Sequence, residues 1–88
     1  LDEVSTTLRS LSERRRLDVL RRLAKTSCYG LELAESMNMD RGNLSRLLSV
    51  LTSQGFLKQE KENQRIYYRT NREAMQVFFD RVMAEIFD

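Results

Sequence analysis

The chain has 88 residues, of which 41% are hydrophobic and 32% are charged, as is typical of one globular domain. No apolar run approaches the roughly 18 residues of a membrane span, and no signal-peptide pattern is visible. The single cysteine, Cys28, excludes an intrachain disulfide and fits a reducing compartment. We therefore expect a cytoplasmic protein.

The absence of histidine excludes several classes of enzyme. Without histidine, and with one cysteine, the chain cannot build a Ser-His-Asp or Cys-His nucleophile or the usual zinc sites. Glycine-rich phosphate-binding motifs are absent too, and acidic pairs such as Glu32 with Glu35 lie among charges typical of a solvated surface. We expect neither an enzyme nor a cofactor or metal site.

The net charge of +2 hides an uneven distribution of charged residues. Residues 9–72 contain 14 Lys or Arg against 7 Asp or Glu, whereas residues 1–8 carry a net charge of −2 and residues 73–88 one of −3. A basic middle between acidic ends suits a protein that turns one face toward phosphate and uses its termini for another purpose.

The helical spacing of apolar residues predicts a first helix over residues 1–11 and a second that runs to about residue 25. The second helix is expected to be capped by Ser10 or Ser12, since Ser10 and Glu13 have the spacing of a capping box. The residues of this helix that we expect to face the core are Leu17, Leu20, Leu23 and Ala24.

A connector over residues 26–30 is expected to lead into a short third helix over residues 31–37. A tight turn over residues 38–40 follows, and Asp40 is placed to cap a fourth helix over residues 41–54. Gly55 then stands where a C-cap residue with a positive φ belongs.

Two short strands are predicted at residues 56–61 and 65–70, with a polar turn at residues 62–64 between them. Thr70 and Glu73 have capping-box spacing and are expected to open a last helix.

The predicted order α-α-α-α-β-β-α is that of a winged helix-turn-helix domain, mainly α with a small β-hairpin. We expect residues 1–88 to form a single domain of this class, with the helix-turn-helix at about 30–54 and the wing at about 56–70. The terminal helices, at about 1–10 and 71–87, then remain for dimerisation.

The fourth helix is the expected recognition element. Its core side is set by Leu44, Leu48, Leu51 and partly by Leu47. The opposite side carries the polar residues Arg41, Asn43, Ser45, Arg46, Ser49 and Thr52. Arginine, asparagine and hydroxyl side chains read base edges in the major groove, so this side predicts a DNA-binding face. Gly42 either lets the backbone approach DNA closely or has no special role.

The predicted hairpin is also basic and polar. Its DNA-binding candidates are Lys61, Asn63, Gln64 and Arg65, and it also carries Lys58 and Arg69. Such a wing can follow the DNA backbone or enter the minor groove. At the start of the second helix, Arg16 is expected to tie helix ends together, whereas for Arg14 and Arg15 phosphate contact and simple solvation are equally open.

The last helix has more apolar residues than a terminal helix on a small core needs. We expect part of this face to bury against a second copy of the chain, because a short chain gains stability from a partner. The expected interface residues are Leu1, Val4 and Leu8 with Met75, Phe78, Phe79, Val82, Met83 and Ile86. The alternative is that the terminal helices pack only against their own chain.

Residues 10–68 resemble the ArsR-type family of prokaryotic winged-helix repressors, and the MarR-type family shares much of the pattern. The segment SLSERRRLDVLRRL resembles that family's second helix, and LELAESMNMDRGNLSRLLSVLTSQGFL resembles its helix-turn-helix and strand entry. QRIYYR resembles its second wing strand. The resemblance implies a symmetric dimer, joined through its first and last helices, that binds an inverted-repeat operator in double-stranded DNA. It implies DNA-facing roles for Arg41, Gly42, Asn43, Ser45, Arg46, Asn63, Gln64 and Arg65.

The chain departs from that family where relatives sense metals. Their Cys-x-Cys positions hold Tyr29 and Leu31 here, Cys28 lies just outside them, and the histidines of other relatives' last helix are absent, so metal sensing is not carried over. Leu47 replaces a frequent histidine, which weakens the case for a base contact there. Cys28 is either a redox switch or, the commoner case, an inert thiol.

Two functions remain open from the sequence. The first is a homodimeric regulator of transcription, with repression the expected sign, that binds specific double-stranded DNA. The alternative is a winged-helix module that binds another protein, which the modest net charge of +2 supports.

Overall fold

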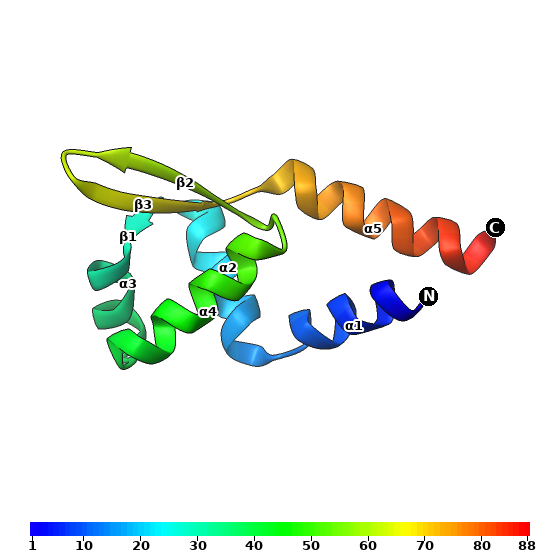
Figure 1. The fold of residues 1–88 in the computed structure, drawn as a ribbon, viewed down its shortest axis with the longest axis horizontal. Coiled ribbons are helices and arrows are strands. Elements are labelled where there is room, and N and C mark those ends of the chain that lie inside the picture. The colour runs from blue at the N-terminus through cyan, green and yellow to red at the C-terminus, as the bar shows by residue number, and fades with distance from the viewer.

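The computed structural model describes residues 1–88 and contains five helices and three short strands (Figure 1). The helices are α1 (Asp2–Leu11), α2 (Arg14–Lys25), α3 (Gly30–Met37), α4 (Arg41–Ser53) and α5 (Arg72–Phe87). The strands β1 (Cys28–Tyr29), β2 (Leu57–Glu62) and β3 (Arg65–Thr70) form an antiparallel sheet in the order β1-β3-β2. Apart from the additional strand β1, the element order is the predicted one, which confirms the winged helix-turn-helix fold.

The molecule is elongated, with extents of 45 × 23 × 19 Å. Figure 1 places α3 and the β2–β3 hairpin at one end, and α1 and α5 at the other, where both chain termini lie. None of the helices combines the length and apolar character that crossing a bilayer requires.

The core lies between α2, α3, α4 and the beginning of β2. Leu23, Leu33, Leu44 and Leu51 are each at most 1% exposed. By contrast, α5 has no buried residue and only reaches the core through its first half. There the ring of Phe78 meets that of Phe56 edge to face, with centroids 5.6 Å apart.

The core-facing side of α2 differs from the prediction. Val19, Leu20 and Leu23 are buried, whereas Leu17 is 49% exposed and Ala24 is also exposed. At 3.6 residues per turn, Leu17 and Ala24 lie about 100–120° around the helix from Leu23, on its flank. The predictions for Leu20 and Leu23 are confirmed and those for Leu17 and Ala24 are wrong, because leucine spacing alone left out the β-branched Val19.

The caps of α2 and α5 also differ from the prediction. Glu13, rather than Ser10 or Ser12, caps α2, since its carboxylate accepts from the Arg16 N–H at 3.2 Å. Asn71, rather than Thr70, caps α5 by accepting from the Ala74 N–H at 3.1 Å.

The displaced hydroxyls make tertiary hydrogen bonds instead of caps. Thr70 Oγ1 donates to the Leu20 carbonyl at 2.7 Å, and Ser10 Oγ accepts from Gln54 Nε2 at 3.1 Å. Arg16 Nη1 donates to both the carbonyl and the hydroxyl of Ser10 at 3.0 Å, which confirms that Arg16 ties α2 to the end of α1.

The orientation of α2 can be tested by comparing the loss of a buried leucine, Leu51 of α4, with the loss of an exposed one, Leu17 of α2. Leu51→Ala should lower the free energy of unfolding by about 2–5 kcal/mol, because it leaves a cavity at a fully buried site. Leu17→Ala should cost much less, since about half of that side chain already meets water. Urea denaturation followed by circular dichroism measures both, and equal losses would contradict the orientation of α2.

Candidate nucleic-acid interface

The orientation of α4 is fixed by its apolar side. Leu44, Leu47, Leu48 and Leu51 are all buried, with Leu47 the most exposed at 9%. The residues left exposed are Arg41, Gly42, Asn43, Ser45, Arg46, Ser49 and, at the end of the helix, Ser53. The predicted recognition residues from Arg41 to Ser49 therefore point away from the core.

Thr52 is the exception on this side of α4. It is half-buried, and its Oγ1 is buried without a hydrogen-bond partner in the chain. Expecting Thr52 on the exposed face was wrong, because the last turn of α4 packs toward the body of the molecule.

The turn before α4 sets where the exposed face begins. Asn38 ends α3 in the left-handed region at φ 52°, and Asp40 caps α4 by accepting from the Asn43 N–H at 3.1 Å, as predicted. A Cβ added to Gly42 would lie 3.1 Å from the capping Oδ2 of Asp40. Glycine at this position therefore leaves room for the cap, a reason that the sequence analysis did not include.

A shallow hollow of about 330 Å³ joins α4 to the beginning of α2. It is lined by Arg15 and Arg16 from α2 and by Asn43 and Arg46 from α4. Since Arg16 is already held by Ser10, Arg15 is the residue of α2 that can add positive charge beside Arg46. Of the two roles left open for Arg15, phosphate contact and simple solvation, its position beside Arg46 favours phosphate contact.

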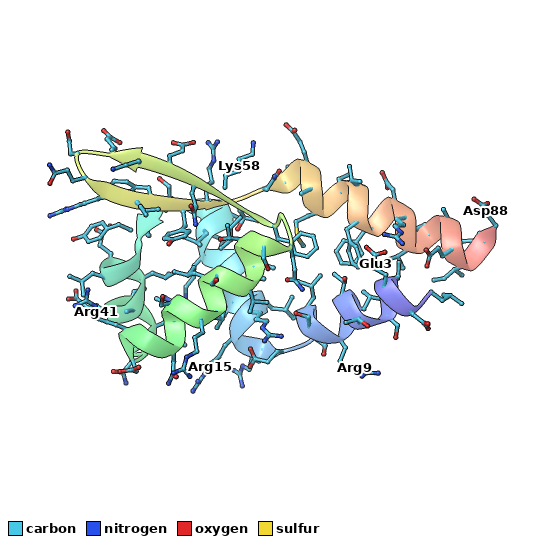
Figure 2. All side chains as sticks on the ribbon, viewed as in Figure 1. Glu3, Arg9, Arg15, Arg41, Lys58 and Asp88 are labelled. Atoms are coloured by element: carbon cyan, nitrogen blue, oxygen red, sulfur yellow. The ribbon has the colours of Figure 1, made fainter.

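A second hollow, of about 450 Å³, joins the beginning of α4 to the wing. Arg41 lines it together with Gln64 and Arg65. Figure 2 shows Arg41 and Arg15 at the side of the molecule that α4 occupies, whereas Lys58 projects from the opposite edge. The exposed face of α4 therefore has arginines on both flanks, one group from α2 and one from the wing.

The wing is a hairpin with a two-residue loop. Glu62 pairs with Arg65, and Asn63 and Gln64 between them have φ values of 51° and 67°. Positive φ at both central residues is typical of a type I′ turn, whose twist matches that of the strands. The predicted hairpin is confirmed, with a turn one residue shorter than expected.

The basic residues of the wing have different surroundings. Arg69 Nη2 forms an ion pair with Glu60 at 3.3 Å across the strands, so its charge is already compensated. Lys61 is exposed. The guanidinium carbon of Arg65 lies 4.6 Å from the ring centroid of Tyr29.

Strand β1 is a feature that the sequence analysis missed, since it treated residues 26–30 as a connector. Cys28 pairs with Tyr68 and Tyr29 pairs with Tyr67, so the wing has a third strand on the side of α3. Two residues are too few for a periodic pattern, and the β-favouring tyrosine was the only local signal. Tyr29 is consequently an addition to the candidate site.

Cys28 is half-buried, and its Sγ lies 3.7 Å from the carbonyl of Thr26. Burial and the negative charge of Glu32 raise the pKa of the Cys28 thiol above its usual range. This direction favours the inert thiol over the acidified thiolate of a redox switch. No group of three or more His, Cys, Asp or Glu side chains gathers in a metal-binding arrangement in residues 1–88.

The terminal helices are joined by ion pairs. Arg81 of α5 bonds to Glu3 of α1 at 3.2 Å and to Glu85 at 3.3 Å, and the Leu1 amino group lies 3.4 Å from Glu85. Arg81 lowers the pKa of Glu3 through its hydrogen bond and charge. Val4 is already buried, at 4% exposed, so most of its surface is covered within the chain.

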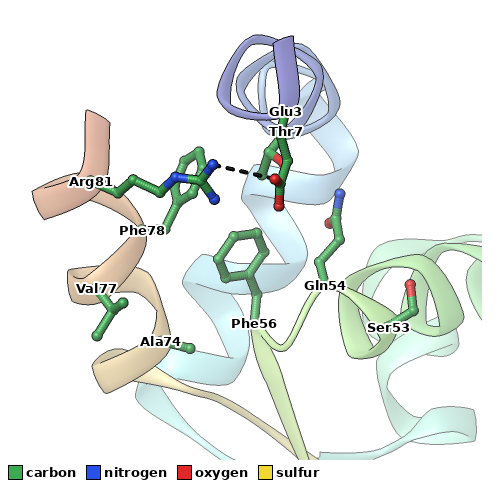
Figure 3. Close-up of a pocket in the computed structure, with 9 residues that line it drawn as sticks. All are labelled: Glu3, Thr7, Ser53, Gln54, Phe56, Ala74, Val77, Phe78 and Arg81. Atoms are coloured by element: carbon green, nitrogen blue, oxygen red, sulfur yellow. Dashed lines mark hydrogen bonds and ion pairs between the residues drawn. The ribbon is translucent and has the colours of Figure 1, made fainter. Parts of the chain in front are cut away.

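A cavity of about 530 Å³ opens where α1, α5 and the end of α4 meet (Figure 3). Phe56 and Phe78 form its apolar wall, and Glu3 and Arg81 at its edge are paired with each other. The ion pairs therefore join α1 and α5 while this space remains open between them.

The outer side of α5 is apolar and uncovered. Phe79, Met83, Ile86 and Phe87 are 42%, 56%, 65% and 75% exposed, and Leu1 is 78% exposed. At 100° per residue, these four α5 residues share one side of the helix, next to the side that carries Phe78 and Val82. Only part of the apolar surface of α5 is thus covered by the chain itself, and the rest is exposed to solvent.

The helix pair α3–α4 and the basic hairpin after it define the class: this is a winged helix-turn-helix domain. Solved structures of transcriptional regulators have the same fold. An ArsR-like transcriptional regulator from Rhodococcus sp. is 22% identical, with 96% of this chain and 82% of that chain covered and a TM-score of 0.80. The transcriptional repressor BigR from Xylella fastidiosa is 26% identical, with 98% and 84% covered and a TM-score of 0.74.

A third neighbour is the homodimeric winged helix-turn-helix DNA-binding domain of Mb0332 from Mycobacterium bovis, a possible ArsR-family regulator. It is 28% identical, with 99% of this chain and 82% of that chain covered and a TM-score of 0.75. No family model and no curated protein matches the chain. The structural neighbours confirm the resemblance to ArsR-type regulators that residues 10–68 indicated.

The raised pKa of Cys28 predicts slow alkylation near neutral pH. The rate of reaction with iodoacetamide should rise with pH around a midpoint above that of the same chain unfolded in urea, because folding favours the neutral thiol. A midpoint below that of the unfolded chain would mean an activated thiolate and would restore the redox interpretation.

Proposed function

We propose that this chain is a transcriptional regulator that binds specific sequences in double-stranded DNA as a homodimer, with repression as the expected outcome, and that it has no enzymatic role. The observation that carries the proposal is the exposed polar side of α4, with arginines from α2 and the wing on its two flanks. The proposal treats residues 1–88 as one domain and needs no metal or cofactor. The proposal includes a cytoplasmic location, because the chromosome of a prokaryote lies in the cytoplasm.

In this proposal α4 enters the major groove. Arg41, Asn43 and Arg46 reach base edges, with arginine suited to guanine and asparagine to adenine. Ser45 and Ser49 contact bases or phosphate. Arg15 and the wing residues Lys61, Asn63, Gln64 and Arg65 lie where they can contact the sugar-phosphate backbone or the minor groove.

The proposed dimer is joined through α1 and α5. The exposed Phe79, Met83, Ile86 and Leu1 supply an apolar surface that a monomer would leave in water. Leu8, Met75, Phe78 and Val82 are half-buried beside it and complete the proposed interface, with Val4 beneath. A two-fold axis there would present two recognition helices about 34 Å apart, which fits an inverted-repeat operator. The similar Mb0332 domain is homodimeric, which supports the proposal of a dimer.

Arg46→Ala tests the recognition face. The variant should bind its operator about 1–3 kcal/mol more weakly and discriminate less between bases at one position, because a bidentate base contact is lost. Fluorescence anisotropy with duplexes selected by the wild-type protein measures both effects. Arg72→Ala is the matched control, since it removes one exposed positive charge at the beginning of α5. Equal losses of affinity in the two variants would mean that Arg46 contributes only positive charge and no specific base contact.

Salt dependence separates DNA binding from the alternative, a protein-binding module. Affinity for mixed-sequence duplex DNA should fall about 100-fold when the salt concentration is raised fourfold, because about four phosphate contacts per dimer release condensed counterions. An affinity that barely changes with salt, or no binding at low salt, would favour the protein-binding alternative.

Met83→Glu tests the dimer. A charge in the proposed interface should convert the dimer to a monomer in sedimentation equilibrium, because it would be buried without a partner. Ala84→Glu adds the same charge at an exposed position about 100° around α5 and should remain dimeric. A wild-type chain that sediments as a monomer at micromolar concentration would overturn this part of the proposal.

A further inference from the structure

Arg65, Tyr29 and Tyr67 form a cluster near the tip of the wing. The guanidinium of Arg65 lies over the Tyr29 ring at 4.6 Å, and the Tyr29 ring meets that of Tyr67 edge to face, with centroids 5.8 Å apart. The strand register explains the contact, because Tyr29 is opposite Tyr67 and Arg65 is two residues before Tyr67 on the same face of β3.

Arg65 contacts the Tyr29 ring although an acidic residue is close enough in the hairpin to form an ion pair. Glu62 is its direct partner across the hairpin, yet Arg65 forms no ion pair with it, whereas Arg69 on the same strand pairs with Glu60. A guanidinium that stacks uses its flat face and keeps its in-plane N–H donors free. Arg65 is therefore held in place while its hydrogen-bonding edge stays available.

Tyr29 is in turn anchored to the helix-turn-helix. It directly precedes α3, is half-buried, and its N–H donates to Glu32 Oε1 of α3 at 3.4 Å. The hollow beside it is shared by Arg65, Gln64 and Arg41, the first residue of α4. Through Tyr29 the wing arginine is thus fixed relative to the beginning of the recognition helix.

We propose that Tyr29 is a positioning residue that holds Arg65 ready to donate hydrogen bonds to DNA beside the wing. The proposal rests on the proposed DNA-binding function. A free arginine loses side-chain freedom when it binds, and an arginine that is already ordered by a ring loses less. Tyr29 therefore contributes to DNA affinity without contacting DNA.

The test is a double-mutant cycle on the 88-residue chain with the tightest duplex that the wild type selects from a random pool. Tyr29→Leu should weaken binding about three- to tenfold, the effect of leaving one long side chain unordered, and should have almost no further effect when Arg65→Ala is already present. Tyr29→Phe keeps a ring and should bind nearly as the wild type does. Arg69→Ala, whose charge is already paired, is the control for the wing.

Thermal unfolding distinguishes positioning from a general loss of structure. If Tyr29→Leu unfolds at a much lower temperature, the DNA affinities of Tyr29→Phe and Arg65→Lys are compared instead. Lysine keeps the charge of Arg65 but lacks its flat face, so Arg65→Lys should bind as weakly as Tyr29→Leu is expected to. Unchanged affinity in Tyr29→Leu, additive effects in the cycle, or wild-type affinity in Arg65→Lys would overturn the role of Tyr29. Failure of the proposed function would be visible earlier, as a wild-type protein that does not bind duplex DNA.

Discussion

The burial of four leucines on one side of α4 is the constraint on which the rest of the site depends. Leu44, Leu47, Leu48 and Leu51 leave the helix one way to face, and that choice exposes every polar residue from Arg41 to Ser49 that could meet a nucleic acid. A rotation of α4 by 100° would bury an arginine without a partner and expose a leucine, both of which are costly. The arginines of α2 and the wing matter only because α4 is held in this orientation.

The other end of α4 connects the recognition face to the terminal helices. Gly55, at φ 85°, reverses the chain so that Phe56 is buried directly after α4, and the Phe56 ring contacts Phe78 of α5. Gln54 bonds to Ser10 at the end of α1. Both helices proposed to form the dimer thus contact residues that directly follow the recognition helix. In the proposed dimer, the placement of α1 and α5 would therefore set the spacing of the two recognition helices.

The sequence predicted the features that depend on local pattern. Leucine periodicity located α4, and Asp40 and Gly55 marked the turns at its two ends. It failed where tertiary contacts compete with local preference. Ser10 and Thr70 had good capping positions, but their hydroxyls bond to Gln54 and Leu20, so Glu13 and Asn71 became the caps. Strand β1 and its Tyr29 could not be predicted, because two residues become a strand only when β3 lies beside them.

The most direct test of the account is an NMR titration of the ¹⁵N-labelled protein with a selected duplex, because it locates the bound surface without any substitution. The account predicts that the largest amide shifts fall in residues 41–49, with smaller ones at the wing tip and near Arg15, while the outer side of α5 stays unchanged. Shifts concentrated on α5, or an α4 that does not respond to DNA, would contradict it.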